Sequence, residues 1–297
     1  MKRIDPADLS VFLAIATHRS FRKAATELGL TASALSHALR NLEERLGLRL
    51  VNRTTRSVAL TEAGERLFNR VTPAFRDIND ALEDLNSFRG TPVGALRINA
   101  AKTSAELVLL PLVTRFLQAF PDVTVDIVVD DGLVDVVADG FDAGVRFGES
   151  IAGDMIAVPL GPRQRTAIIA TPDYLKTREI PKHPRDLLSL PCIRYRFAGG
   201  RFYRWEFERG GTELEIEVDG PLALDDQDLM VDAALAGTGI AYVFEGLVRR
   251  HLAEGRLVRL LEDWCPYYPG FFLYYPGRRQ LPAALRAFVD FVKTTKL

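Results

Sequence analysis

The sequence predicts a chain of three parts: a small helical domain, one long helix and an α/β body. Three observations predict this division. Apolar residues recur every three or four positions from 6 to 46, an apolar seam with the same spacing runs from 68 to 85, and β-branched runs alternate with helical patterns beyond 94. With 297 residues, of which 47% are hydrophobic and 26% charged, the chain can form two or three domains with their own cores.

Composition argues against several classes of protein. The first ten residues, MKRIDPADLS, place Asp5, Pro6 and Asp8 where a signal peptide needs an apolar run, and no apolar stretch approaches the roughly 18 residues that span a bilayer. We therefore expect a cytoplasmic protein. Cys192 and Cys265 lie 73 positions apart with no clustered ligands, which favours two buried thiols over a metal site or a disulfide, with a redox sensor as the remaining alternative. We expect no metal ion and no cofactor.

Charge is distributed unevenly along the chain. The formal net charge is −1, but residues 1–60 hold ten Lys and Arg against five Asp and Glu, which leaves 28 against 34 for the rest. A basic front and an acidic body suggest that the front meets a polyanion.

Three short helices are predicted in the front. Ser20 and Thr31 are N-cap types that open the second and third helices, and Gly29 and Gly47 are C-cap types that end them. The first helix begins at Pro6 and ends near Thr17. The apolar stripes of the three helices are Leu9, Phe12, Leu13 and Ala16; then Phe21, Ala24, Ala25 and Leu28; then Leu35, Leu39, Leu42 and Leu46.

The third helix carries a polar face as well. Offsets of three or four residues gather four polar side chains away from the leucines: Ser33, Ser36, His37 and Arg40. Ala32 keeps the start of this helix slim, so it can enter the roughly 12 Å major groove of DNA, while Arg22 and Lys23 of the preceding helix meet phosphates. This is a helix-turn-helix arrangement. The alternative is a helical hairpin with a solvated polar face.

A small β-hairpin is predicted next, because LRLV and SVAL alternate on either side of NRTTR. Its tip offers Arg53, Thr54, Thr55 and Arg56. With two arginines and no acid, this tip is typical of a wing that contacts phosphates or enters the minor groove. A solvated loop is the alternative.

One long helix is predicted from Glu62 to Phe88. Its a/d seam consists of Phe68, Val71, Phe75, Ile78, Leu82 and Leu85. The seam packs either against its own domain or against a second chain, and Pro73 should kink the helix. The turn residues RGTPVG, at 89–94, mark a domain boundary.

These front motifs resemble the winged helix-turn-helix of the LysR-type transcriptional regulators. The positions that match the family pattern are Ala24, Ala25, Leu28, Ser33, Ser36, Leu42, Glu43, Leu46, Gly47, Arg53, Leu60, Thr61, Ala63 and Gly64. The resemblance implies that the long helix is a linker that pairs two chains, and it extends the assembly to a tetramer. Ala32 departs from the family's frequent Gln or Pro, and His37 from its frequent Arg, so base preferences do not transfer.

Beyond Gly94 the pattern alternates between strands and helices. A first unit reads as strand ALRINAA, helix 104–119, strand VTVDIVVD, a short helix near 134–138 and strand FDAGVRFG, which predicts a parallel sheet with crossover helices. A second unit, from about Arg165, contains TAIIATPDYL, PCIRYRF, the hairpin WEFERGGTELEIEVDG, a helix after Asp225, GIAYVF and GRLVRLL. Strand GFFLYYPG and a helix from 282 to 292 complete the chain.

The body resembles the effector domain of the same family, and in detail its CrgA-like and AaeR-like subgroup, at FDAGVRFGE, ATPDYL, HPRDLL, AALAGTGIAYV, GRLVRLLEDW and LPAALRAFVDF. The resemblance implies a two-lobed fold similar to periplasmic binding proteins, with crossovers near Leu160 and Tyr268. We therefore expect a winged helix-turn-helix domain at 1–61, a linker helix at 62–90 and an effector-binding domain at 91–297. Lobe I then spans about 91–161 and 267–297, and lobe II about 162–266.

In such folds a small ligand binds at the carboxyl ends of strands, between the lobes. The candidate residues are Lys102, Thr103, Ser104, Arg146 and Phe147 in lobe I, and Arg196, Phe197, Gly199, Asp226 and Phe244 in lobe II. Their cationic and aromatic content favours an anionic effector. Structural alternatives stay open: Thr103 and Ser104 as N-caps, Arg146 as an ion-pair partner and Phe244 as core.

Three functions compete at this point. An enzyme lacks support, since Gly-x-Ser-x-Gly, a phosphate loop and His-Glu-x-x-His are absent and the four histidines do not cluster. A solute-binding protein for transport would share the body, but not the DNA-binding front. We therefore expect a ligand-responsive regulator that binds an inverted repeat of double-stranded DNA as a dimer or tetramer. Its effector would change DNA bending or contact with RNA polymerase.

Overall fold

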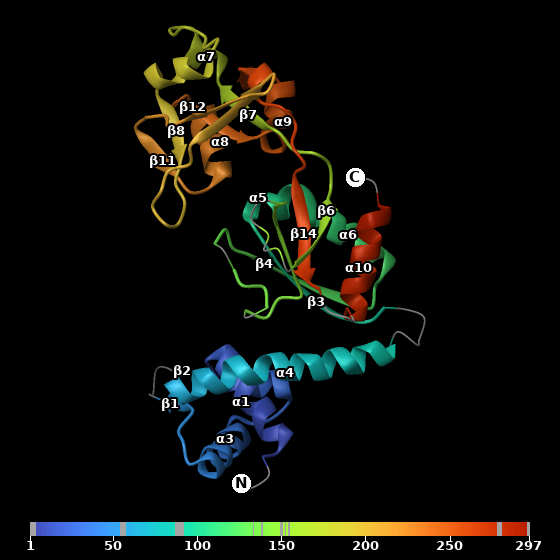
Figure 1. The fold of residues 1–297 in the computed structure, drawn as a ribbon. Coiled ribbons are helices and arrows are strands. Elements are labelled where there is room, and N and C mark those ends of the chain that lie inside the picture. The colour runs from blue at the N-terminus through green and yellow to red at the C-terminus, as the bar shows by residue number, and fades with distance from the viewer. Residues whose placement is uncertain are drawn as a thin grey trace. The chain divides into compact units, whose positions relative to one another are not determined.

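The computed structural model describes residues 4–53, 58–86, 92–132, 134–137, 139–148, 151, 153, 155–277 and 281–295 (Figure 1). The chain divides into two compact units. One comprises residues 1–89 with 137–140, and the other residues 90–136 and 141–297. Among the described residues, no helix is both long and apolar enough to cross a membrane.

The first unit begins with the three predicted helices, α1 (Pro6–His18), α2 (Phe21–Leu28) and α3 (Ala32–Leu46). The side chains of Ser20 and Thr31 accept hydrogen bonds from backbone N–H groups in the first turns of α2 and α3, and Gly29 and Gly47 end these helices in the left-handed conformation. The helices share one apolar core, whose fully buried members include Phe12, Ile15, Leu35, Leu39 and Leu42. The predicted caps and apolar stripes of α2 and α3 are therefore confirmed. In α1 the buried side chains are Val11, Phe12, Ala14, Ile15 and Ala16, whereas Leu9 and Leu13 of the predicted stripe are half-buried.

The wing is a two-stranded antiparallel hairpin of β1 (Val51–Arg53) and β2 (Val58–Leu60), in which Val51 pairs with Leu60. Helix α4 (Glu62–Asn86) follows directly and contains Pro73. Its first turn packs so closely on the wing that a Cβ at Gly64 would lie 2.0 Å from the carbonyl oxygen of Leu50. A glycine is thus required where the helix meets the wing.

Lobe I of the second unit is built on a five-stranded sheet with the order β4-β3-β5-β14-β6. Strand β3 is parallel to β4 and β5, whereas β14 is antiparallel to β5 and β6. The strands are β3 (Gly94–Ala100), β4 (Val123–Val129), β5 (Ala143–Phe147), β6 (Met155–Leu160) and β14 (Phe271–Pro276). The helices of this lobe are α5 (Lys102–Ser104), the π-helical turn η2 (Ala105–Leu109), α6 (Leu110–Ala119) and α10 (Ala283–Thr294).

Lobe II has a second five-stranded sheet with the order β11-β8-β12-β7-β13 and a separate β9–β10 hairpin. Its strands are β7 (Thr166–Ala170), β8 (Cys192–Tyr195), β9 (Trp205–Arg209), β10 (Thr212–Ile216), β11 (Leu222–Leu224), β12 (Ile240–Phe244) and β13 (Val258–Leu260). Its helices are α7 (Pro172–Leu175), α8 (Gln227–Leu235) and α9 (Glu245–Ala253), with 3-10 turns η4 (Pro184–Ser189) and η5 (Glu262–Trp264).

Two chain passes connect the lobes. The segment after β6 and the segment before β14 pair at Gln164 and Tyr268, whose backbones exchange hydrogen bonds of 3.1 and 2.9 Å. Strand β6 ends at Leu160 just before the first pass, and Tyr268 lies just before β14 on the second.

The structure corrects one expectation and extends another. Residues 134–135 are irregular and residues 136–137 form a turn and not a helix, because Val136 packs with Phe141 and Tyr274 in a small apolar cluster. The predicted parallel pairing of the first three strands is confirmed, since β3 is parallel to both β4 and β5. The whole lobe I sheet is nevertheless mixed, because the returning strand β14 enters it between β5 and β6, antiparallel to both. Strand pairing of this kind depends on contacts far apart in sequence.

Candidate functional site

The outer face of α3 presents polar groups on the side opposite to its buried leucines. Ser33, His37 and Arg40 are exposed, while Ser36 is half-buried. The imidazole Nδ1 of His37 lies 3.1 Å from the side-chain nitrogen of Asn41, one turn further along the helix. The exposed side chains alternate with core positions, so a partner can contact them without disturbing the fold.

The other predicted DNA-contacting residues are only partly described. Arg22 and Lys23 are exposed in the first turn of α2, and Ala32 is exposed at the start of α3. The backbone of Arg53 ends β1, but its side chain lies outside the described residues, as do Thr54, Thr55 and Arg56.

The seam of α4 has two different environments. Phe68 packs against the core of the first unit, and Val71 and Phe75 are half-buried. Ile78, in contrast, is 56% exposed. The side chains of Leu82 and Leu85 lie outside the described residues. The seam therefore packs against its own domain near the start of α4 and leaves an apolar side chain uncovered further on.

Lys102 joins the two lobes. Its ammonium nitrogen is ion-paired with Asp226 and lies 2.6 Å from a carboxylate oxygen of Asp228, both of lobe II. The hydrogen bonds that the ammonium group of Lys102 donates to Asp226 and then to Asp228 raise the pKa of Lys102. Burial opposes ionisation of Asp226, but Lys102 and the N–H of Leu229 hold the pKa of Asp226 below its ordinary value. Burial, together with the charge of Asp228, raises the pKa of nearby Glu106.

The helix start at Lys102 already has an anionic partner in lobe I. The backbone N–H of Lys102 donates a 2.9 Å hydrogen bond to the carboxylate of Asp131. Ala101 is the N-cap residue, so neither Thr103 nor Ser104 caps the helix. Thr103 is half-buried, and the buried hydroxyl of Ser104 donates to the carbonyl of Ala101 at 2.8 Å. The alternative of capping roles for these two residues is therefore wrong.

Arg146 is buried in lobe I, and its guanidinium donates to lobe I itself. One terminal nitrogen donates to Asn99 at 2.7 Å and to the carbonyls of Asp130 and Gly132 at 2.9 Å each. The other donates to the carbonyl of Val145 at 2.8 Å. The guanidinium thus holds the chain after β4 against β3 and β5 through neutral acceptors, and none of the described residues forms an ion pair with it.

Phe147 and Phe244 lie against each other where the lobes meet. Their rings stack with centroids 5.6 Å apart and an interplanar angle of 7°, and Phe271 lies 4.6 Å from Phe147. Phe244 is buried and belongs to the apolar core of lobe I, although β12 is a lobe II strand. These rings form an apolar contact between the lobes.

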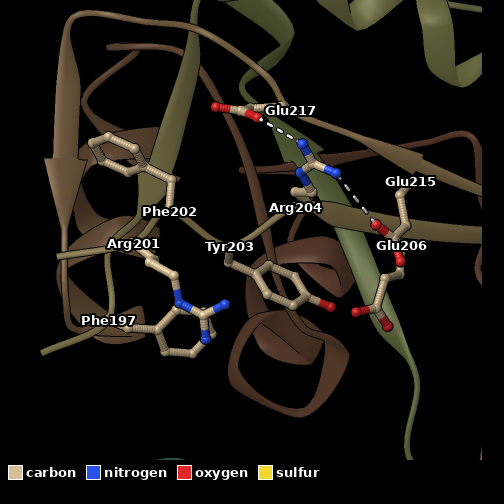
Figure 2. A pocket seen from close by; sticks show the side chains of 8 residues that line it. All are labelled: Phe197, Arg201, Phe202, Tyr203, Arg204, Glu206, Glu215 and Glu217. Carbon is tan, nitrogen blue, oxygen red and sulfur yellow. Dashed lines mark hydrogen bonds and ion pairs between the residues drawn. The ribbon is translucent and has the colours of Figure 1, made fainter. Parts of the chain in front are cut away.

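The remaining lobe II candidates lie on an exposed loop beside a pocket. Arg196, Phe197 and Gly199 are exposed, and only Phe197 lines the pocket. The pocket has a volume of about 730 Å³, and all its lining side chains come from lobe II (Figure 2): Phe197, Arg201, Phe202, Tyr203, Arg204, Glu206, Glu215 and Glu217. Of the ten predicted effector residues, four therefore lie where the lobes meet, namely Lys102, Phe147, Asp226 and Phe244, and one, Phe197, lines this separate pocket.

Sequence reasoning missed the carboxylates that meet Lys102. Asp228, two positions after Asp226, and Asp131, which follows β4, are not among the predicted site residues. Their pairing with Lys102 depends on the crossover topology, which no local pattern records.

The comparisons with known proteins decide the family. Residues 6–65 match the model of the bacterial regulatory helix-turn-helix protein of the lysR family, and residues 89–296 match the LysR substrate binding domain. The chain belongs to the LysR family of transcriptional regulators. It is therefore a DNA-binding transcriptional regulator with a C-terminal effector-binding domain.

Similar LysR-family proteins cover nearly the whole chain. An uncharacterized HTH-type transcriptional regulator of Escherichia coli K12, YcaN, is 45% identical over 295 residues, which are 99% of this chain and 97% of that protein. PgrR of the same organism is 42% identical over 294 residues, 99% and 98% of the two chains. The structure of CrgA, a LysR-type regulator from Neisseria meningitidis, matches with a TM-score of 0.58 at 26% identity over 98% of both chains. That of full-length AphB from Vibrio cholerae has a TM-score of 0.66 at 22% identity, over 99% and 100%, and shares the fold.

Proposed function

We propose that Ser33, Ser36, His37 and Arg40 contact base edges in the major groove. The observation that carries this proposal is the division of α3 into buried leucines and an exposed polar face. Serine and histidine side chains offer both donors and acceptors, and arginine reads guanine with two parallel hydrogen bonds. Arg22, Lys23 and the wing residues 53–56 then hold the phosphate backbone, which supplies affinity without sequence information.

A dimer reads an inverted repeat in this proposal. One helix covers only a few base pairs, so two recognition helices bind half-sites whose centres lie about 34 Å apart, or a multiple of that distance. The exposed Ile78 supports α4 as a pairing helix, because a seam residue that is uncovered in one chain can be covered by another. The same proposal includes a tetramer on a longer site, contact with RNA polymerase, action in the cytoplasm and membership of the CrgA-like and AaeR-like subgroup.

The limits of the domains are also part of the proposed function. We place the winged helix-turn-helix at 1–61, the linker at 62–90 and the effector domain at 91–297, with lobe I at about 91–161 and 267–297 and lobe II at about 162–266. The end of β2 at Leu60, the start of α4 at Glu62 and the Gln164–Tyr268 pairing support these limits.

The effector of this proposal is a small anion that binds between the lobes at Lys102. In the structure, Asp226 and Asp228 hold the ammonium group that an effector carboxylate would need. An anionic effector would therefore compete with these two carboxylates for the ammonium group of Lys102. Its binding would replace the ion pair that joins the lobes with an ion pair between Lys102 and the ligand. Such an effector shifts the protein only to the extent that it binds two arrangements of the lobes with different affinity.

The test begins with DNA. Purified protein is footprinted on duplex DNA from its own genomic neighbourhood, at two salt concentrations and beside a random-sequence control. We expect protection of a dyad-symmetric site that remains stronger than random binding as the salt concentration rises. Binding that shows no preference at either salt concentration would contradict the assignment of a base-reading face. The same footprint, repeated with small carboxylates, then tests the effector.

A further inference from the structure

One acidic side chain of α3 ties the start of the wing to that helix. Glu43 lies one turn beyond Arg40 on α3 and is half-buried. One oxygen of its carboxylate, Oε1, accepts hydrogen bonds from the backbone N–H groups of Leu50 and Val51, at 2.8 and 3.1 Å. Because Val51 is the first residue of β1, this carboxylate connects the helix to the base of the hairpin.

The backbone of Glu43 holds the same stretch of chain. Its carbonyl accepts hydrogen bonds from the N–H of Gly47, at the end of α3, and from the N–H of Leu48 at 3.2 Å. The carbonyl and the carboxylate of this residue together hold four of the five N–H groups from 47 to 51. Hydrogen bonds depend on direction, whereas apolar contacts do not, so Glu43 fixes the path from α3 into β1.

The start of α4 holds this stretch from the other side. The hydroxyl of Thr61 donates a hydrogen bond to the carbonyl of Arg49 at 2.7 Å, and its N–H donates to the carbonyl of Leu50 at 2.9 Å. The hydroxyl of Thr61 also accepts from the N–H of Gly64, in the first turn of α4, at 3.0 Å. Leu50 thus has its N–H held by α3 and its carbonyl held by the residue that precedes α4.

The wing depends on such supports because it is small. Strands β1 and β2 are three residues long each, and an isolated two-stranded hairpin is at best marginally stable in water. Leu50 and Val51 are buried, with exposed fractions of 1% and 4%, so water has little access to their N–H groups. Removal of the Glu43 carboxylate would leave two buried donors without an acceptor, which favours a shift of the wing.

The charge of Glu43 allows this role to be tested by the sign of an effect. Residues 1–60 hold ten Lys and Arg against five Asp and Glu, and an acidic group on the helix that meets DNA is repelled by phosphates. Loss of that repulsion should strengthen binding to any DNA, whereas displacement of the wing should weaken binding. The two effects of removing the carboxylate therefore have opposite signs.

We propose that Glu43 is a positioning residue for DNA binding, which fixes the wing at the distance from α3 at which bases and phosphates are contacted together. It touches no DNA and acts through the backbone of Leu50 and Val51. The proposal rests on the proposed contacts of α3 with bases and of the wing with phosphates. It adds that the two contacts are coupled.

Four variants of the full-length protein separate position from charge. Glu43→Gln keeps the side-chain length and one acceptor oxygen but removes the charge, whereas Glu43→Asp keeps the charge and is one methylene shorter. We expect Glu43→Asp and Glu43→Ala to bind the footprinted site about tenfold more weakly, and Glu43→Gln to stay within about twofold of the unaltered protein. The matched control is Glu44→Ala, which removes the same charge at the next, exposed residue and should not weaken binding.

Hydrogen exchange of the DNA-free protein is the second readout, because it does not depend on DNA binding. In Glu43→Ala and Glu43→Asp, amides of residues 48–53 should exchange about tenfold faster, while exchange in α1 stays unchanged. Glu43→Gln should restore slow exchange. A merely structural role would instead raise exchange throughout the first unit.

A double-variant cycle measures the coupling with the wing. Arg53→Ala should weaken DNA binding less in Glu43→Ala than in the unaltered protein, because a displaced wing has already lost its phosphate contact. The proposal is overturned if the two losses add, if Glu43→Ala binds DNA more tightly, if Glu43→Gln behaves as Glu43→Ala does, or if exchange at 48–53 is unchanged in Glu43→Ala. If the unaltered protein prefers no DNA site, the proposed base reading fails, and the exchange comparison decides separately whether Glu43 holds the wing.

Discussion

Arg40 is the residue on which base reading by α3 can be tested most directly. It is exposed on the helix face opposite Leu35, Leu39 and Leu42, so its removal should leave the core of the first unit in place. Arg40→Ala should lower affinity for the specific site by about 1–3 kcal/mol while affinity for random DNA changes much less. The measurement is a competition titration against specific and random duplexes at two salt concentrations.

Arg53→Ala provides the comparison for Arg40→Ala. If Arg53 neutralises a phosphate, its removal should weaken specific and random binding alike and reduce the salt slope by about one unit. Equal losses on both DNAs for Arg40→Ala would assign Arg40 to the backbone and leave base reading to the serines and His37.

The two cysteines allow a second test at this scale. Cys192 and Cys265 are both buried, and burial raises their pKa values to about 12 and about 11, with Asp219 adding to the effect at Cys192. Because the thiolate is the reactive form, almost none of it is present at pH 8. We expect an aromatic disulfide reagent to leave both thiols unmodified in the native protein and to modify both in denaturant. Rapid modification of the native protein would favour the alternative of a redox sensor.

Residue types were easier to predict than residue partners. The sequence indicated that Lys102 and Arg146 lie at strand ends near a ligand site, because apolar runs locate strands and their ends. It did not indicate that Arg146 donates to the carbonyls of Asp130 and Gly132, or that Lys102 pairs with a lobe II carboxylate. Such partners are set by tertiary contacts between segments 14 to 126 positions apart, for which the local pattern carries no signal.

At the scale of elements, helices with their own caps were the best predicted. α2 and α3 begin after Ser20 and Thr31 and end at Gly29 and Gly47 because the caps satisfy backbone groups locally. The predicted short helix near 134–138 is wrong for its described residues, because Val134 and Val136 pack in a small cluster with Phe141 and Tyr274 and do not form the face of a helix. Strands β6 and β11 were not predicted, since each takes its place from neighbours in the sheet, and helix α9 was not predicted either.

The seam of α4 leads to a prediction about assembly. Ile78 is 56% exposed in the single chain, so Ile78→Asp should not disturb the core of the first unit but should place a charge in any helix pair. We expect this variant to be monomeric, or to dissociate at a much higher protein concentration than the unaltered protein does. Light scattering over a concentration series measures this. Phe75→Asp should act in the same direction, although Phe75 is half-buried in its own chain.

Asn69→Asp is the matched control for the seam. Asn69 is exposed and lies on the side of α4 away from the seam, so the same charge there should leave assembly unchanged. An Ile78→Asp variant that keeps its mass in solution would assign oligomerisation to another surface.

At the scale of the whole effector domain, two kinds of contact join the lobes. Stacked Phe147 and Phe244 make an apolar contact beside the crossovers, and a Cβ at Gly246 of lobe II would lie 2.8 Å from Leu107 of lobe I. The ion pairs of Lys102 with Asp226 and Asp228 make a polar one. Apolar contacts at a crossover persist during small rotations, whereas an ion pair can be exchanged for a ligand, so the polar contact is where an effector can act.

Asp228→Asn tests that exchange. Removing one competing carboxylate frees part of the Lys102 charge, so affinity for an anionic effector should rise by about two- to fivefold, the size expected for a partly exposed pair. Asp226 is left unaltered because it also caps α8.

The measurement compares benzoate and benzylamine, which have similar shapes and opposite charges, by the shift that each causes in the unfolding temperature. Asp232→Asn, an exposed aspartate on the same helix, is the matched control and should change neither. A larger shift with benzoate for Asp228→Asn supports an anionic effector at Lys102. If the variant instead loses a shift that the unaltered protein shows with benzylamine, the carboxylates are the ligand-binding groups, Lys102 is their internal substitute, and the effector is a cation.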